Sequence, residues 1–138
     1  MTRSSPIASC RTFNGDLRIK IASAGLYTYA DCSVVCGELQ YPGDQSDVIL
    51  NPLLIVEVLS PSTEGYERGK NFELHRTIES FREYLTVHQD GQHVEHYSRQ
   101  DDGSWLLREN TGAGGSTAIA RLGVRIGLED LYAPALIG

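Results

Sequence analysis

The sequence predicts a single α/β domain, in which a mixed β-sheet is followed along the chain by an antiparallel β meander. Three observations indicate this class: a nearly continuous apolar run at 53–59, a helical pattern directly after it, and short strand-like segments joined by tight turns in the second half. An uninterrupted apolar run is typical of a central strand that is covered on both faces. The 138 residues are enough to bury one core.

The first half of the chain is expected to contribute two more strands. Residues 17–21 alternate between apolar and charged side chains, which predicts an outer strand with one solvated face. Residues 32–35 predict a second strand, and Asp31 stands at its entrance. The stretch 37–52 contains glycines and prolines at a density that predicts a long loop before the central strand.

A helix is expected after the central strand, from about residue 64 to about residue 78. Ser62 or Thr63 can cap its first turn, because short hydroxyl side chains accept hydrogen bonds from the free backbone amides there. On such a helix Lys70 borders the face that is turned towards the sheet. Its amine can therefore point back towards the central strand.

The second half predicts three strands joined by Asp-Gly pairs, which favour tight hairpin turns. These strands cover residues 84–88, 93–99 and 105–108. A flexible glycine segment then leads to a short strand at 124–126 and a last turn of helix at 128–132. His93 and His96 lie three apart on one of these strands, so they face opposite sides and are poor joint metal ligands.

Composition excludes several classes of protein. Hydrophobic residues make up 41% of the chain and charged residues 22%, which are ordinary values for a globular domain. The longest apolar run is far shorter than the roughly 20 residues of a membrane span, and the first residues lack the apolar centre of a secretory signal. We therefore expect a cytoplasmic protein with no membrane partner.

The three cysteines are Cys10, Cys32 and Cys36, and they form no Cys-x-x-Cys pair. An odd number with this spacing argues against a disulfide framework and against a zinc site. Because free cysteine is often buried, we expect Cys32 and Cys36 to be small strand residues with free thiols.

The net charge of −6 counts against strong nonspecific affinity for nucleic acid, since such binders usually carry a basic patch. Carboxylates that hold a metal ion reverse the local sign of charge once the ion is bound. An acidic chain therefore remains compatible with a metal-dependent site.

Glu57 places a carboxylate inside the otherwise apolar central strand. A buried charge costs several kcal/mol unless it is paired or bound to a metal. A structural ion pair with Lys70 or Arg68 is one explanation. The other adds Asp31: two carboxylates suit Mg²⁺ or Mn²⁺, and a nearby lysine can orient or deprotonate an attacking water. Asp31, Glu57 and Lys70 would then form a divalent-metal phosphodiesterase site.

Four parts of the sequence resemble the Uma-two family of restriction endonucleases, within the PD-(D/E)XK nuclease superfamily. They are Asp31, LIVEVLSPST at 54–63, RGKNFE at 68–73 and REYL at 82–85, and the resemblance extends from about Arg11 to about Tyr132. The segment 54–63 is the most specific of them.

This resemblance implies a restriction-endonuclease-like α/β core, in which Asp31 and Glu57 are metal ligands and the Val58 carbonyl is a third. The wider superfamily has its lysine two residues after the glutamate, where this chain has Leu59. The resemblance therefore assigns the lysine's role to Lys70.

The chain departs from the family pattern at three points. Ala30 stands where the family has proline, and His75 stands where a tyrosine is usual. The family also has an N-terminal segment of helices and a first strand, which we expect this chain to lack.

The sequence is compatible with two functions. The first is a Mg²⁺-dependent endonuclease that hydrolyses DNA. The second is a noncatalytic remnant that keeps the core and associates through exposed sheet edges, most simply as a homodimer.

Overall fold

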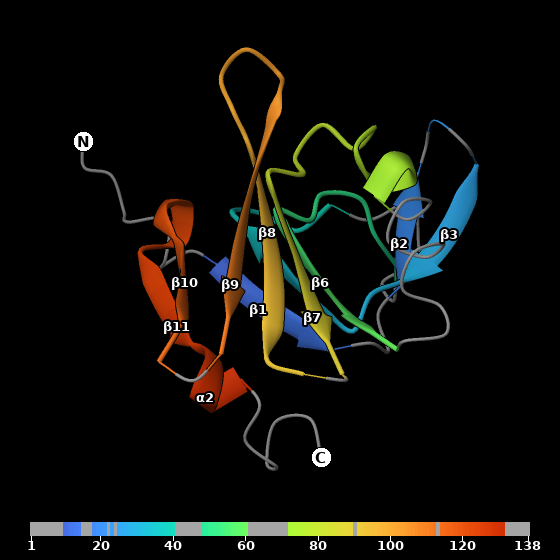
Figure 1. Ribbon diagram of the computed structural model, residues 1–138. Helices are drawn as coiled ribbons and strands as arrows, with labels where there is room; N and C mark the ends of the chain where they lie inside the picture. Colours follow the sequence, from blue (N-terminus) through green and yellow to red (C-terminus); the bar gives the residue numbers. More distant parts are fainter. Residues whose placement is uncertain are drawn as a thin grey trace.

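The structure of the protein is a computed structural model. It describes residues 10–14, 18–21, 23, 25–40, 48–60, 72–89, 91–112 and 114–131. A six-stranded mixed sheet forms the centre of the molecule, in the order β1-β4-β6-β7-β8-β9 (Figure 1). Its strands are β1 (Cys10–Asn14), β4 (Cys32–Cys36), β6 (Leu54–Leu59), β7 (Glu83–His88), β8 (His93–Arg99) and β9 (Trp105–Thr111).

The apolar run at 53–59 forms β6, which lies inside this sheet as predicted. β6 and β7 are parallel. The other pairs around them are antiparallel: β4 with β6, β7 with β8, and β8 with β9. Parallel neighbours need a crossover connection, and residues 60–82 provide it, with helical backbone at 72–75. The antiparallel meander predicted for the second half is formed by β7, β8 and β9.

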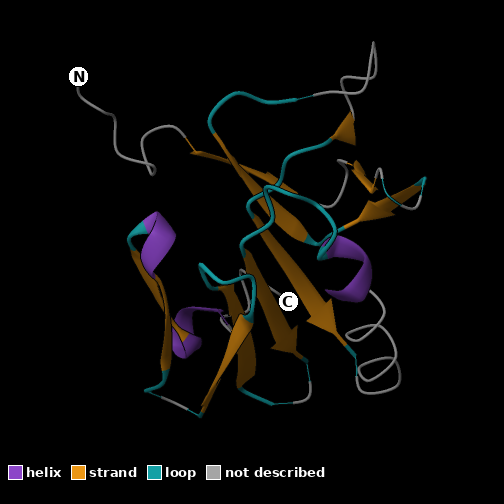
Figure 2. Ribbon diagram, turned by 90° about the horizontal axis from the view of Figure 1, so that it is seen from above, coloured by secondary structure: helices purple, strands orange, loops and turns teal. Residues whose placement is uncertain are grey.

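Two small sheets lie on either side of the central sheet (Figures 1 and 2). One contains β2 (Arg18–Ile21), β3 (Leu26–Tyr29) and β5 (Val48–Ile49), and the helical residues 72–75 lie on the same side. The other is the antiparallel pair of β10 (Ser116–Ile119) and β11 (Val124–Gly127), with a 3-10 turn at Ala120–Leu122 between them and α2 (Leu128–Leu131) after them.

Each face of the central sheet has its own apolar cluster. Successive residues of a strand point to opposite faces, so Ile55 joins the cluster beneath β2 and β5, whereas Leu54 joins the cluster beneath β10 and β11. The helical residues are attached to the first face by Phe72, whose ring stacks on Tyr84 at 5.2 Å between centroids. This aromatic contact fixes the side of the sheet on which the crossover connection returns.

Two predictions about the first half of the chain were wrong. The segment at 18–21 is the middle strand of a separate small sheet and not an outer strand of the main one. Its alternation showed only that one face is solvated, which does not identify the neighbouring strands. Cys36 is not a free thiol, because it forms a disulfide with Cys10 on β1. No strand was predicted at 10–14, so nothing placed Cys10 opposite Cys36.

Other predictions hold in part. Cys32 is a free cysteine, as expected. The helix ends at residue 75 and not at 78, because Thr77 and Ile78 donate to the carbonyls three residues earlier and so tighten the chain into a turn. Its predicted start lies outside the described residues. No helix among the described residues is long and apolar enough to cross a membrane.

Leu85→Ala should lower the free energy of unfolding by about 2–5 kcal/mol, since it leaves a cavity in a close-packed layer. Leu85 is 1% exposed on β7. Leu107→Ala is the matched control, because Leu107 is 43% exposed on the edge strand β9, and its effect should stay within about 0.5 kcal/mol. Urea unfolding monitored by circular dichroism measures both, and equal losses would contradict this core.

Candidate metal centre

Asp31 and Glu57 lie next to each other on neighbouring strands. β4 and β6 are antiparallel with Cys32 opposite Val56, so one further step of this register sets Asp31 opposite Glu57. The backbone amide of Val58 donates a 2.7 Å hydrogen bond to Oδ2 of Asp31. Asp31 is exposed at the strand's entrance, whereas Glu57 is only 7% exposed. The structure therefore brings together two of the carboxylates that the sequence singled out.

The hydrogen bond from Val58 orients Asp31 without exhausting its oxygens. An ionised carboxylate has about four acceptor positions, so Oδ1 and the second lone pair of Oδ2 remain available to a cation. Val58 contacts Asp31 through its backbone amide. The metal ligand expected from the sequence is the backbone carbonyl of Val58. That ligand role of Val58 stays a prediction, and Lys70 lies outside the described residues.

Polar side chains continue from Glu57 across the sheet. Glu57 is opposite Thr86 on β7, and Thr86 is opposite Glu95 on β8. Directly opposite residues share a face, and the hydroxyl of Thr86 donates a 3.1 Å hydrogen bond to Oε1 of Glu95. All three side chains are buried. We call Glu57, Thr86 and Glu95 the polar row.

The polar row begins where the aromatic cluster on the same face ends. The apolar cluster beneath the small sheet includes Ile55 and Tyr84. These residues come two positions before Glu57 on β6 and Thr86 on β7. Glu57 therefore lies at the rim of a dry layer. Low-dielectric surroundings strengthen its attraction to a cation, and the exposed neighbour Asp31 provides the open side.

The opposite face carries a different buried acid, Glu83. Its Oε1 is 2.6 Å from Nε2 of His96, and its Oε2 accepts hydrogen bonds from the hydroxyl of Ser98 at 3.0 Å and Nε of Arg121 at 2.7 Å. Arg121 compensates the buried charge, so this cluster has a structural role. His96 lies here and His93 does not, which confirms that the two histidines face opposite sides.

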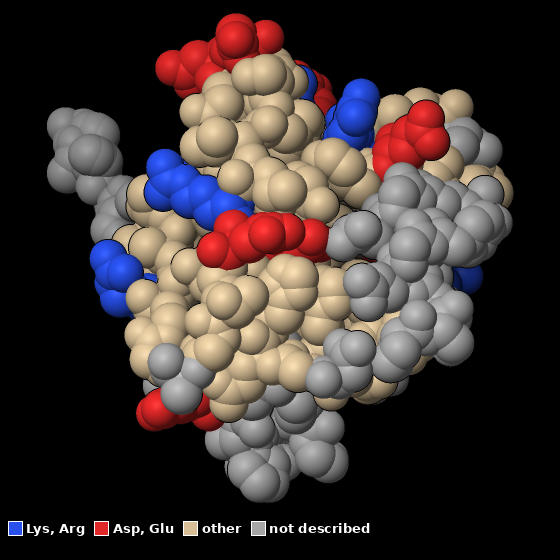
Figure 3. Space-filling model, viewed as in Figure 1, with Lys and Arg blue, Asp and Glu red and all other residues tan. Residues whose placement is uncertain are grey.

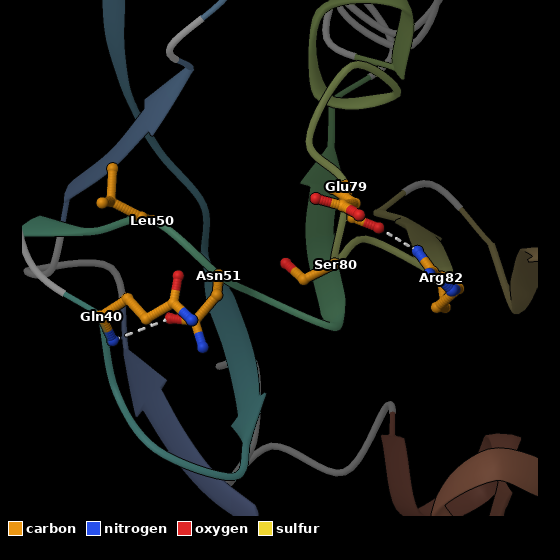
Figure 4. Close-up of a pocket in the computed structure, with 6 residues that line it drawn as sticks. All are labelled: Gln40, Leu50, Asn51, Glu79, Ser80 and Arg82. Carbon is orange, nitrogen blue, oxygen red and sulfur yellow. Dashed lines mark hydrogen bonds between the residues drawn. The ribbon is translucent and has the colours of Figure 1, made fainter.

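A hollow of about 400 Å³ lies at the amino end of β6 (Figure 4). Three of its polar side chains are used within the fold: Asn51 accepts from the backbone of Gln40, Ser80 donates to the carbonyl of Pro52, and Arg82 donates to the carbonyl of Glu79. It is lined by neither Asp31 nor Glu57. We therefore do not assign it to the metal centre.

Cys32 is next to Asp31 in the chain but does not join the donor set. Burial, and secondly the negative charge of Asp31, raise the pKa of its thiol. A thiol in this environment stays protonated at neutral pH, while metal ligation requires the thiolate. Cys32 also lines the apolar cavity on the other face, together with Val34 and Val56.

Asp31→Asn should speed alkylation of Cys32 by iodoacetamide at pH 8. The change removes the charge that helps raise the pKa of the thiol, while the amide oxygen can still accept from Val58. The gain should be less than about 10-fold, because burial is the larger cause and remains. Non-reducing conditions keep Cys10 and Cys36 joined. Asp101→Asn is the control, and an unchanged rate in Asp31→Asn would contradict the electrostatic contact.

Sequence reasoning missed Thr86, His88 and Glu95 as neighbours of Glu57. The Asp-Gly pair at 90–91 could have indicated them. A tight turn there places His88 opposite His93 and, two residues further along each strand, Thr86 opposite Glu95 on the same face. The parallel register of β6 and β7 could not be obtained this way, because it depends on how the crossover connection packs.

Comparisons with known proteins agree with this fold. The profile of the Uma2 family, described as "Putative restriction endonuclease", matches residues 4–134. Uncharacterized protein sll1609 of Synechocystis sp. is 38% identical over 100 residues, covering 72% of this chain and 56% of that protein. Uncharacterized protein slr1290 of the same organism is 35% identical over 125 residues, covering 89% and 63%. The chain thus covers less than two thirds of either relative's length.

A solved structure supports the fold at lower sequence identity. It is described as a "putative nuclease belonging to DUF820" from Anabaena variabilis, and it aligns with a TM-score of 0.68 and 17% identity over 90% of this chain and 68% of that one. The predicted restriction-endonuclease-like fold is therefore confirmed. Because the family profile matches nearly the whole sequence, the chain belongs to the Uma2 family.

Proposed function

We propose that this chain is the nuclease domain of a divalent-metal-dependent endonuclease that hydrolyses DNA phosphodiester bonds. The observation that carries the proposal is the pair of carboxylates, one buried and one exposed, which adjacent strands hold side by side at Asp31 and Glu57. Oxygen donors of this kind fit Mg²⁺ or Mn²⁺. Family membership supports the reaction class.

The residues of the chain have separate roles in this proposal. Asp31 and Glu57 would hold the ion, with the Val58 carbonyl as a third ligand, and the Val58 amide keeps Asp31 in position. When bound, the ion would supply charge for the scissile phosphate and a more acidic water. Lys70 would orient that water or accept its proton.

The surface charge explains why the ion would also be needed for binding. The net charge is −6, and on the face shown in Figure 3 basic side chains are scattered among acidic ones without a continuous basic patch. Phosphates are repelled by a face of this kind unless a cation intervenes. We therefore expect DNA affinity to depend on the divalent ion.

Glu57→Gln should abolish saturable Mn²⁺ binding in calorimetry and lower plasmid cleavage in Mg²⁺ by at least about 100-fold, because a ligand contributes at least as much as the groups that support it. Glu129→Gln is the matched control, since Glu129 is exposed on α2, and it should keep both properties. Cleavage by Glu57→Gln at the wild-type rate, with contaminating nuclease excluded, would disprove the proposal.

Lys70→Ala should separate binding from chemistry. If Lys70 acts on the water, its loss leaves Mn²⁺ affinity nearly unchanged and lowers the cleavage rate by about 10²–10⁴-fold, the range typical of general acid-base groups. Single-turnover cleavage at saturating metal measures the rate. A loss of Mn²⁺ binding in Lys70→Ala, with the fold retained, would contradict this role.

The structure also favours a second candidate, an association module that forms a homodimer. The edge strand β9 exposes Leu106 and Leu107, each 43% accessible, and β3 exposes Leu26, Tyr27 and Tyr29. Exposed apolar edge strands favour pairing with another chain. Light scattering tests this candidate: a dimer mass that Leu106→Lys converts to a monomer supports it, and a monomeric wild-type protein contradicts it.

A further inference from the structure

His88, His93 and Glu95 bring three metal-ligating side chains together at the hairpin between β7 and β8. His88 is the last residue of β7 and His93 the first of β8. Their rings stack at 4.2 Å between centroids, with 10° between planes. Glu95 lies two residues after His93 and so on the same face of the sheet. One donor atom from each of the three residues lies within 4.8 Å of the other two.

The distances are close to those of a bound metal. Zinc binds imidazole nitrogen and carboxylate oxygen at about 2.0–2.2 Å, so two ligands of a tetrahedral ion are about 3.4 Å apart. Nε2 of His88 is 3.8 Å from Oε1 of Glu95. A shift of a few tenths of an ångström closes this pair. The His93 donor lies within 4.8 Å of both, and its ring would have to turn out of the stacked arrangement to face the same ion.

Burial and accessibility also suit an ion site. The side chains of His88 and Glu95 are 3% and 5% exposed, whereas that of His93 is 33% exposed and leaves a route to solvent. The hydroxyl of Thr86 donates to Oε1 of Glu95, which orients the carboxylate as supporting hydrogen bonds do in metalloproteins. Oε2 of Glu109 lies 3.8 Å from Nε2 of His93 and offers a fourth donor from β9.

We propose that His88, His93 and Glu95 bind one borderline divalent ion, of which Zn²⁺ is the best fit, at a site separate from Asp31 and Glu57. Imidazole nitrogens select ions such as Zn²⁺ and Co²⁺, whereas two carboxylates select Mg²⁺ or Mn²⁺. The two sites therefore differ in the ion they prefer.

Its position indicates a structural role for this ion. Glu95 is two strands away from Glu57, and Thr86 lies between them on β7. An ion at the histidine site would join the ends of β7 and β8. It would hold Glu95 and Thr86 beside Glu57 without taking part in the hydrolysis.

Co²⁺ is the probe, because its visible absorption reports nitrogen ligation and low coordination number. Purified wild-type protein is titrated with Co²⁺ in excess Mg²⁺, which occupies the carboxylate site. We expect one equivalent to bind with visible bands, Zn²⁺ to displace it, and Zn²⁺ to raise Tm. His93→Gln should weaken Co²⁺ binding at least 100-fold and lose the Tm shift.

Three further variants sharpen the test. Glu95→Gln keeps an acceptor for Thr86 and should also lose the bands, which covers the case that His93→Gln fails to fold. Gln92→Ala, which changes the residue next to His93 just outside β8, should bind Co²⁺ as the wild type does. Glu57→Gln should keep the bands, so failure of the nuclease proposal is distinguishable. Absence of saturable Co²⁺ or Zn²⁺ binding by the wild type, or equal affinity in His93→Gln, would overturn the inference.

Discussion

The position of β6 between an antiparallel and a parallel neighbour determines everything that lies near Glu57. Pairing with β4 sets Asp31 beside Glu57, and pairing with β7 sets Thr86 on its other side. A slip of one residue in either pair would turn a whole strand over, exchanging Glu57 for Val56 or Val58 on the face that carries the polar row. The apolar side chains on both faces prevent such a slip, because each would then meet the wrong cluster. The core therefore fixes the site through the register.

Stability and function compete along the polar row. A strand as central as β6 is stabilised by burying apolar side chains, and Glu57 interrupts that pattern with a carboxylate that must lose water. The aromatic cluster of Phe72, Phe81 and Tyr84 compensates on the same face, since aromatic contacts contribute large buried areas. The two requirements are met at different places along β6: the apolar cluster includes Ile55, and the polar row begins two residues later at Glu57. Natural proteins commonly tolerate such local costs where a ligand is to be bound.

The sequence predicted what depends on local pattern. The apolar run identified β6, the Asp-Gly pairs identified the hairpins of β7 to β9, and Glu57 was conspicuous because of its neighbours. It could not predict which strands pair across long distances: the small sheet of β2, β3 and β5 was missed, and Cys10 was not placed opposite Cys36. The same limit hid the polar row. Thr86 and Glu95 are ordinary residues of a meander until the parallel β6–β7 register sets them beside Glu57.

The two faces of the sheet each bury a glutamate, and the two glutamates differ in whether their surroundings suit a metal ion. Glu83 accepts a hydrogen bond from the guanidinium of Arg121, and the hydroxyl of Ser98 donates to the same oxygen. An ion would have to displace a cation already in place. Glu95 accepts a hydrogen bond from the hydroxyl of Thr86, and its Oε1 lies 3.8 Å from Nε2 of His88, a side chain of the kind that commonly binds metal ions. A metal ion bound to Glu95 would gain the imidazole of His88 as a second ligand, while Thr86 would continue to orient the carboxylate. The side chains that surround each carboxylate therefore decide which face of the sheet can hold an ion.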